Sequence, residues 1–187
     1  MKALLLIICL NLSSAIAAAA EVSGVFIDDQ VKTQNGETLV LNGTGLREKF
    51  WVDVYVGSLY LPEKSGDVAG ILSKPGPLRI QLDFIYKEVA ADELLESWRE
   101  GFEKNQNADS LASLKHRIDQ FYGYFDSSAV ARDQYRFDYQ PGVGTSVSKN
   151  KTLLGVIPGE DFRNALVEIW LGNHPADKDL KKAMLGL

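Results

Sequence analysis

Residues 41–62 constrain the fold of this chain more than any other segment. Gly43-Thr44-Gly45 predicts a tight turn with positive φ, and the β-branched and aromatic residues that follow predict one long strand. Side chains of an extended chain alternate between two faces. One face would carry Arg47, Trp51, Asp53 and Tyr55, and the other Phe50, Val52, Val54 and Val56. A bulge at Gly57 would reset this alternation.

The face that carries Arg47 and Tyr55 has groups that can bind an anion. If it points into a cavity, a guanidinium beside a phenol suits a carboxylate or a phenolate, and apolar walls would hold the rest of a ligand. Alternatively, Arg47 is a rim residue paired with Glu48 or Asp53, and Tyr55 is ordinary packing. Spacing alone leaves both interpretations open. Arg47 and Tyr55 are therefore the candidate ligand-binding residues.

The rest of the chain predicts an α+β domain. Strict alternation over residues 79–86 predicts a half-buried strand whose core face carries Ile80, Leu82, Phe84 and Tyr86. Apolar stripes predict helices over residues 92–104, 109–125, 160–171 and 177–185, with Asp92 and Asp109 as N-caps of the first two. Further strands are expected over residues 22–27, 38–41, 134–139, 143–148 and 152–157. Sequential hairpins with grouped helices indicate a mainly antiparallel sheet covered by helices.

Residues 1–20 are typical of a secretory signal peptide. Lys2 precedes an apolar run that is too short to span a bilayer, and small residues allow cleavage after Ala17 or Ala20. The single cysteine, Cys9, lies within this run, so residues 21–187 would fold as one domain without disulfides. We therefore expect an exported protein with no membrane span in the mature chain.

Composition argues against several functional classes. The formal net charge is −5, and no basic run is present that would hold nucleic acid or an anionic membrane surface. Only His116 and His174 are available as histidine ligands, and they form no zinc-binding motif with cysteine or glutamate. No nucleophile elbow or phosphate-binding loop is present. We expect neither a metal nor another cofactor.

Two blocks of sequence resemble the chalcone isomerase-like family. The first has the order Gly-x-Gly-Leu-Arg, then Lys-Phe, then Val-Tyr-Val-Gly-Ser-Leu-Tyr-Leu, within residues 43–61. The second runs from Gly155-Val156-Ile157-Pro158-Gly159 through Ile169-Trp170-Leu171-Gly172 to Leu185-Gly186. The resemblance implies an open-faced β-sandwich, with a mainly antiparallel sheet, a layer of helices and a ligand cleft between them.

The resemblance also has implications for the site. This chain has only part of the active-site sequence pattern that the enzymes of the chalcone isomerase-like family carry. Arg47 matches the family arginine that would stabilise an anionic oxygen, but Tyr55 stands where the enzymes carry threonine. The Thr-Gly-Lys-Gln-Tyr segment of the enzymes is absent, and Tyr86 near that position lies in a different local sequence. An arginine with a tyrosine in place of threonine is the pattern of the family's fatty-acid-binding members, in which both residues bind the carboxylate.

Three functions remain open at this point. The favoured one is an exported, non-catalytic protein of the bacterial periplasm that binds a small amphipathic, fatty-acid-like carboxylate through Arg47 and Tyr55. The second is an isomerase of the intramolecular lyase type, acting on a phenolic or enone substrate with Arg47 and Tyr55 as catalytic residues. The third is a cell-envelope interaction protein whose cleft is filled by its own side chains.

Overall fold

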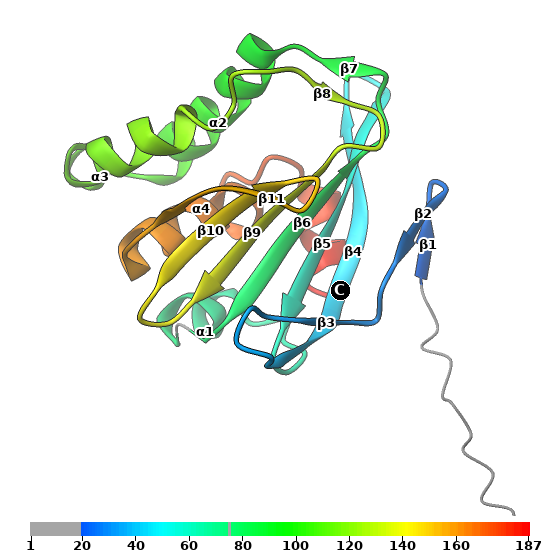
Figure 1. The fold of residues 1–187 in the computed structure, drawn as a ribbon, viewed down its shortest axis with the longest axis horizontal. Helices are drawn as coiled ribbons and strands as arrows, with labels where there is room; N and C mark the ends of the chain where they lie inside the picture. The colour runs from blue at the N-terminus through cyan, green and yellow to red at the C-terminus, as the bar shows by residue number, and fades with distance from the viewer. Residues whose placement is uncertain (1–19, 75) are drawn as a thin grey trace, which may run out of the picture.

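The computed structural model describes residues 20–74 and 76–187, and its centre is a seven-stranded antiparallel sheet (Figure 1). From one edge to the other its strands are β11 (Thr152–Ile157), β10 (Gly144–Lys149), β9 (Gln134–Gln140), β6 (Leu78–Phe84), β5 (Val52–Leu61), β4 (Thr38–Lys49) and β3 (Gln30–Lys32). Two small sheets accompany it, one of β1 (Ala20–Val22) and β2 (Val25–Ile27), and one of β7 (Glu88–Val89) and β8 (Ala129–Val130). The predicted signal peptide lies almost wholly outside the described residues.

Helices cover one face of the large sheet. They are α1 (Val68–Ser73), α2 (Ala91–Asn105), α3 (Ala108–Tyr122), α4 (Glu160–Leu171) and α5 (Lys178–Met184). Figure 1 shows α4 and α5 behind the sheet and the α2–α3 pair along its upper end. The expected α+β class, with a mainly antiparallel sheet and a helical layer, is confirmed. The N-cap assignments were wrong, since α2 begins after Ala90 and α3 after Asn107, whose side chain accepts a hydrogen bond from the Ser110 amide.

Aromatic side chains fill the space between sheet and helices. Trp98 of α2 is buried, and its ring centroid lies 5.2–5.7 Å from those of Phe121, Phe125, Phe137 and Trp170. Tilted and edge-to-face pairs of this kind contribute about 0.5–1.5 kcal/mol each beyond the area that they bury. This cluster packs α2, α3 and α4 against the sheet.

The β4–β5 segment is a hairpin and not the single long strand that the sequence predicted. Its two-residue turn consists of Phe50 and Trp51, with φ of 51° and 66°. The glycines Gly43 and Gly45 form no turn; they lie inside β4, where α5 packs directly on the sheet. A Cβ at Gly45 would lie 2.5 Å from the Cβ of Ala183, so their role is to admit the helix.

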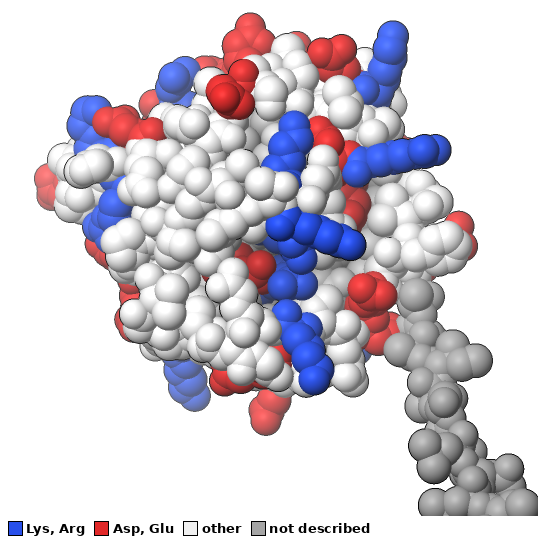
Figure 2. All heavy atoms as spheres, viewed as in Figure 1, with Lys and Arg blue, Asp and Glu red and all other residues white. Residues whose placement is uncertain are grey.

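The opposite face of the sheet is polar and charged over its middle strands. Figure 2 shows lysine and arginine side chains along this face with acidic side chains between and around them. Arg79 of β6 and Asp138 of β9 form an ion pair there, with a 2.5 Å contact between Nε and Oδ1. Near β4 and β5 the same face is apolar, and Ile27 of β2 packs with Val56 and Tyr60. The N-terminal hairpin therefore covers only this edge.

Candidate functional site

A cavity of about 360 Å³ opens at the end of the β4–β5 hairpin, between the sheet and α2. Its apolar wall comes from β5, β6, β7, α2 and α4, and includes Val54, Phe84, Val89, Leu94, Trp98 and Ile169. Its polar lining includes Arg47, Lys49, Tyr55, Ser97 and His174. A mostly apolar cavity with a few convergent polar groups is the usual form of a small-molecule site.

A β-bulge at Val54 places the two candidate residues side by side. Next to the turn, Glu48 pairs with Asp53, which on a regular ladder would place Arg47 opposite Val54. The observed register shifts by one residue, and Arg47 pairs directly with Tyr55. Residues directly opposite on antiparallel strands point to the same face. Arg47 and Tyr55 do share a face, as predicted, but because they pair across two strands and not because they alternate along one. The bulge that matters lies at Val54, whereas the one considered from the sequence was at Gly57.

The shift at Val54 also changes the neighbours of this pair. Trp51 and Asp53 were expected beside Arg47 and Tyr55, but both are exposed, with Trp51 at the tip of the hairpin. Arg47 is not paired with Asp53. Tyr86 was expected in the core, but β6 ends at Phe84, and Tyr86 is 43% exposed at the rim of the cavity.

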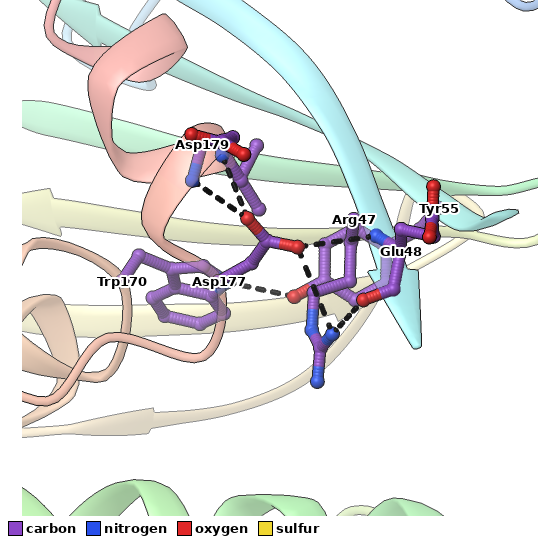
Figure 3. A network of polar contacts seen from close by, with 7 residues as sticks. Arg47, Glu48, Tyr55, Trp170, Asp177 and Asp179 are labelled. Carbon is purple, nitrogen blue, oxygen red and sulfur yellow. Dashed lines mark hydrogen bonds and ion pairs between the residues drawn. The ribbon is translucent and has the colours of Figure 1, made fainter. Parts of the chain in front are cut away.

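Tyr55 presents a protonated phenol at the edge of the cavity. It is 8% exposed, and its hydroxyl accepts a hydrogen bond of 3.0 Å from the indole Nε1 of Trp170 (Figure 3). Burial raises the pKa of Tyr55 above its ordinary value, although the positive charge of Arg47 partly opposes this rise. Because the indole N–H donates this bond, the proton of the Tyr55 hydroxyl remains available to a ligand acceptor.

Arg47 lies between the start of α5 and the cavity. Its Nη1 donates to the carbonyl oxygen of Glu48 at 2.5 Å and lies 4.0 Å from Oδ2 of Asp177. Asp177 is the N-cap of α5: Oδ1 accepts from the amides of Asp179 and Leu180, and Oδ2 accepts from the amide of Glu48 (Figure 3). Both of these Arg47 contacts involve Nη1, so the donors on Nε and Nη2 remain available to a ligand.

Two further cations border the cavity. Lys104 is held by Glu100 on α2 at 2.8 Å, and the pKa of Glu100 is lowered chiefly by that hydrogen bond. Lys49 lies near the hairpin turn, with Nζ 6.0 Å from the centre of the Phe50 ring. Glu93 and Glu100 line the cavity as well, so its charged lining is of mixed sign, and Lys104 is already paired with Glu100.

Among the buried aromatic residues, Trp98 also lines the cavity, whereas Phe102, Phe121 and Phe125 do not. Both histidines are exposed, and His174 lies at the cavity rim. Within residues 20–74 and 76–187, no group of three or more His, Cys, Asp or Glu side chains could hold a metal ion. The same residues contain no helix long and apolar enough to cross a membrane.

Sequence reasoning missed three residues of the site. Trp170 and Asp177 are more than 100 positions from Tyr55 and Arg47 in the chain, and no local pattern links them. Lys49 was noted only as part of a motif. Its position beside a hairpin turn was hidden because Phe50 and Trp51 lack the glycine or asparagine that marks such turns.

Comparisons with known proteins agree with this architecture. A crystal structure of a fatty-acid binding protein from Arabidopsis thaliana superimposes with a TM-score of 0.64 at 15% sequence identity, over 83% of this chain and 95% of that one. No curated protein matches the sequence significantly. The sequence pattern described as chalcone isomerase-like matches residues 19–186. The chain therefore belongs to the chalcone isomerase-like family.

Proposed function

We propose that this chain is an exported, periplasmic, non-catalytic protein that binds a small amphipathic carboxylate, such as a fatty acid. One observation carries the proposal: Arg47 and Tyr55 lie directly opposite each other on β4 and β5, and both line a largely apolar cavity. The ligand carboxylate would accept hydrogen bonds from the guanidinium and the phenol. The hydrocarbon part would lie against Val54, Leu94 and Ile169.

The protonation of the two groups suits a carboxylate. A raised pKa keeps the Tyr55 phenol neutral, so that it donates a hydrogen bond and carries no opposing charge. Hydrogen bonds to charged groups contribute about 1.5–3 kcal/mol each. Loss of the Arg47 donors should therefore weaken binding by roughly tenfold to a hundredfold, at 1.4 kcal/mol per factor of ten.

The cavity volume limits the size of the ligand. Liquid water occupies about 30 Å³ per molecule, and a methylene group is of similar size. A cavity of about 360 Å³ therefore holds on the order of a dozen non-hydrogen atoms. Acids of medium chain length would fit inside, and the tail of a longer acid would extend through the mouth.

The resemblance to a fatty-acid binding protein supports the proposal at the level of the fold. The lyase-type isomerase is less favoured because the family's tyrosine segment is absent and Tyr86 lies at the rim, exposed to solvent. The interaction protein without a ligand is less favoured because the cavity reaches Arg47.

Native mass spectrometry tests the proposal on protein purified from the exported fraction without detergent. We expect a released acid in stoichiometric amount, reduced in Arg47→Met and in Tyr55→Phe. Arg99→Met removes an exposed arginine on α2 whose partner is Glu96, and should leave retention unchanged. Retention in the Arg47→Met/Tyr55→Phe double variant would overturn the site. Conversion of an added chalcone, lost in Arg47→Met, would favour the enzyme.

A further inference from the structure

Two adjacent aromatic side chains project from the tip of the β4–β5 hairpin. Phe50 is 85% exposed and Trp51 is 93% exposed. The other two tryptophans of the chain, Trp98 and Trp170, are 3% and 1% exposed. Full exposure of a tryptophan forgoes the stabilisation that burial of its ring would provide, so this pair needs an explanation.

The turn itself does not explain the choice of residues. Both residues have positive φ, a conformation that favours glycine or asparagine in a two-residue hairpin turn. Two other hairpins of this chain also have two positive φ angles, and each includes one favoured residue: Gly24 after Ser23 between β1 and β2, and Asn150 before Lys151 between β10 and β11. The turn at Phe50 and Trp51 includes neither glycine nor asparagine, so its two aromatic rings are kept at the cost of backbone strain.

The tip also forms part of the cavity mouth. Lys49, Phe50 and Val52 line the cavity at this end, and Tyr86 lies on the adjoining rim. Val52 and Tyr86 are themselves partly exposed, so the apolar surface continues from the tip to the opening. A ligand that passes through this mouth would pass beside the aromatic pair.

The size and charge of the tip favour a lipid surface over a protein partner. Phe and Trp bury about 150–250 Å² each, so the pair supplies roughly half of the 800 Å² per side that a stable protein interface requires. Insertion into a bilayer needs no complementary shape, and tryptophan prefers the membrane–water interface. Lys49 is flanked by exposed Glu48, which lies across the hairpin from exposed Asp53, so attraction to anionic lipid is not the main contribution to membrane binding.

We propose that Phe50 and Trp51 insert into the interface of a phospholipid bilayer and place the cavity mouth against the lipid. The proposal rests on the function proposed above, because an amphipathic carboxylate partitions into membranes and would enter the cavity from there. Docking itself requires only the hairpin tip. It is therefore measurable with vesicles that contain no free fatty acid.

Tryptophan fluorescence provides a direct test. The full-length mature protein is mixed with vesicles of phosphatidylcholine, with or without phosphatidylglycerol, and followed by emission and by co-sedimentation. Because Trp98 and Trp170 are already buried, a blue shift on addition of vesicles reports on Trp51. We expect a blue shift and co-sedimentation with both lipid compositions, and little release by salt.

The variant Phe50→Asn/Trp51→Gly supplies the residues that this turn geometry prefers, so it should fold at least as stably as the wild type. It should lose co-sedimentation. Phe26→Ala is a matched control, because Phe26 is a 73% exposed aromatic residue on β2, away from the cavity; it should still bind vesicles. Unchanged co-sedimentation of the double variant, or a blue shift that follows protein concentration without vesicles, would overturn the proposal.

Failure of docking can be separated from failure of the proposed function. Retention of an acid is measured in solution by mass spectrometry on Arg47 and Tyr55 variants that keep the tip, whereas docking is measured with vesicles that contain no acid. If the protein retains an acid but does not bind vesicles, the docking proposal alone is overturned. A protein that binds acid-free vesicles but retains no acid overturns the proposed function, and leaves the insertion of Phe50 and Trp51 supported.

Discussion

Tyr55→Phe should destabilise the empty protein, independently of any effect on a ligand. The hydroxyl of Tyr55 is the acceptor for the indole Nε1 of Trp170, and both side chains are buried. Removing the hydroxyl leaves a buried N–H donor without a partner. A buried polar group that loses its partner costs about 1–3 kcal/mol of folding free energy.

A double-mutant cycle measures this contact. Urea unfolding of the wild type, Tyr55→Phe, Trp170→Phe and the double variant, followed by far-ultraviolet circular dichroism, gives four free energies of unfolding. In the double variant neither partner remains to be left unsatisfied, so its loss should be smaller than the sum of the single losses. We expect a coupling of about 1–2 kcal/mol, within the range for residues in contact.

Tyr86→Phe is the matched control, because it removes the same hydroxyl from a tyrosine that is 43% exposed. A surface change of this kind should alter stability by less than about 0.5 kcal/mol. The reasoning is refuted if Tyr55→Phe is as stable as Tyr86→Phe and the losses in the cycle are additive. In that case the Tyr55 hydroxyl would not satisfy Trp170 in solution.

Three further predictions concern other parts of the molecule. Gly45→Ala should lower the free energy of unfolding by about 1–3 kcal/mol, because the new Cβ would overlap α5. Gly76→Ala is the control and should not lower it, because no atom lies nearer than 3.9 Å to the new Cβ. Urea unfolding measures the free energy of unfolding of both variants. Arg117 donates hydrogen bonds to both carboxylate oxygens of Asp161 and lowers the pKa of this carboxyl below its ordinary value of 3.8. The pair therefore stabilises the fold fully at pH values above the ordinary pKa. This stabilisation is lost as the pH falls through the lowered pKa. Asp161→Asn should therefore flatten the acid limb of thermal stability against pH. Ser97→Phe, on the cavity wall, should reduce acid retention in native mass spectra without loss of stability.

Periodic patterns predicted most of the secondary structure. The alternation of polar and apolar residues before Phe84 and the apolar stripes of α2 and α4 are set by spacing within each segment, so they can be recognised without knowledge of the tertiary structure. The hairpin turn was missed for the opposite reason. Phe50 and Trp51 are poor turn formers, so the sequence at this point favours a continuous strand.

The composition of the site could be predicted only in part. Arg47 and Tyr55 were identified, and the structure brings both to one cavity, although their role in binding a ligand stays a prediction. Their partners Trp170 and Asp177 come from the other end of the chain, and no local rule links segments so far apart. Gly43 and Gly45 were taken for a turn because the packing of α5 on β4 is likewise non-local.

The bulge at Val54 has a consequence for how such a site can evolve. Val54 is the extra residue of β5, so deletion of its codon would leave a regular ladder in which Tyr55 still lies opposite Arg47. The cavity would lose one apolar lining residue, but the head-group pair would stay on one face of the sheet. Relatives that keep the pair can therefore differ here by one residue in chain length, and an ungapped alignment of such chains would compare residues from opposite faces.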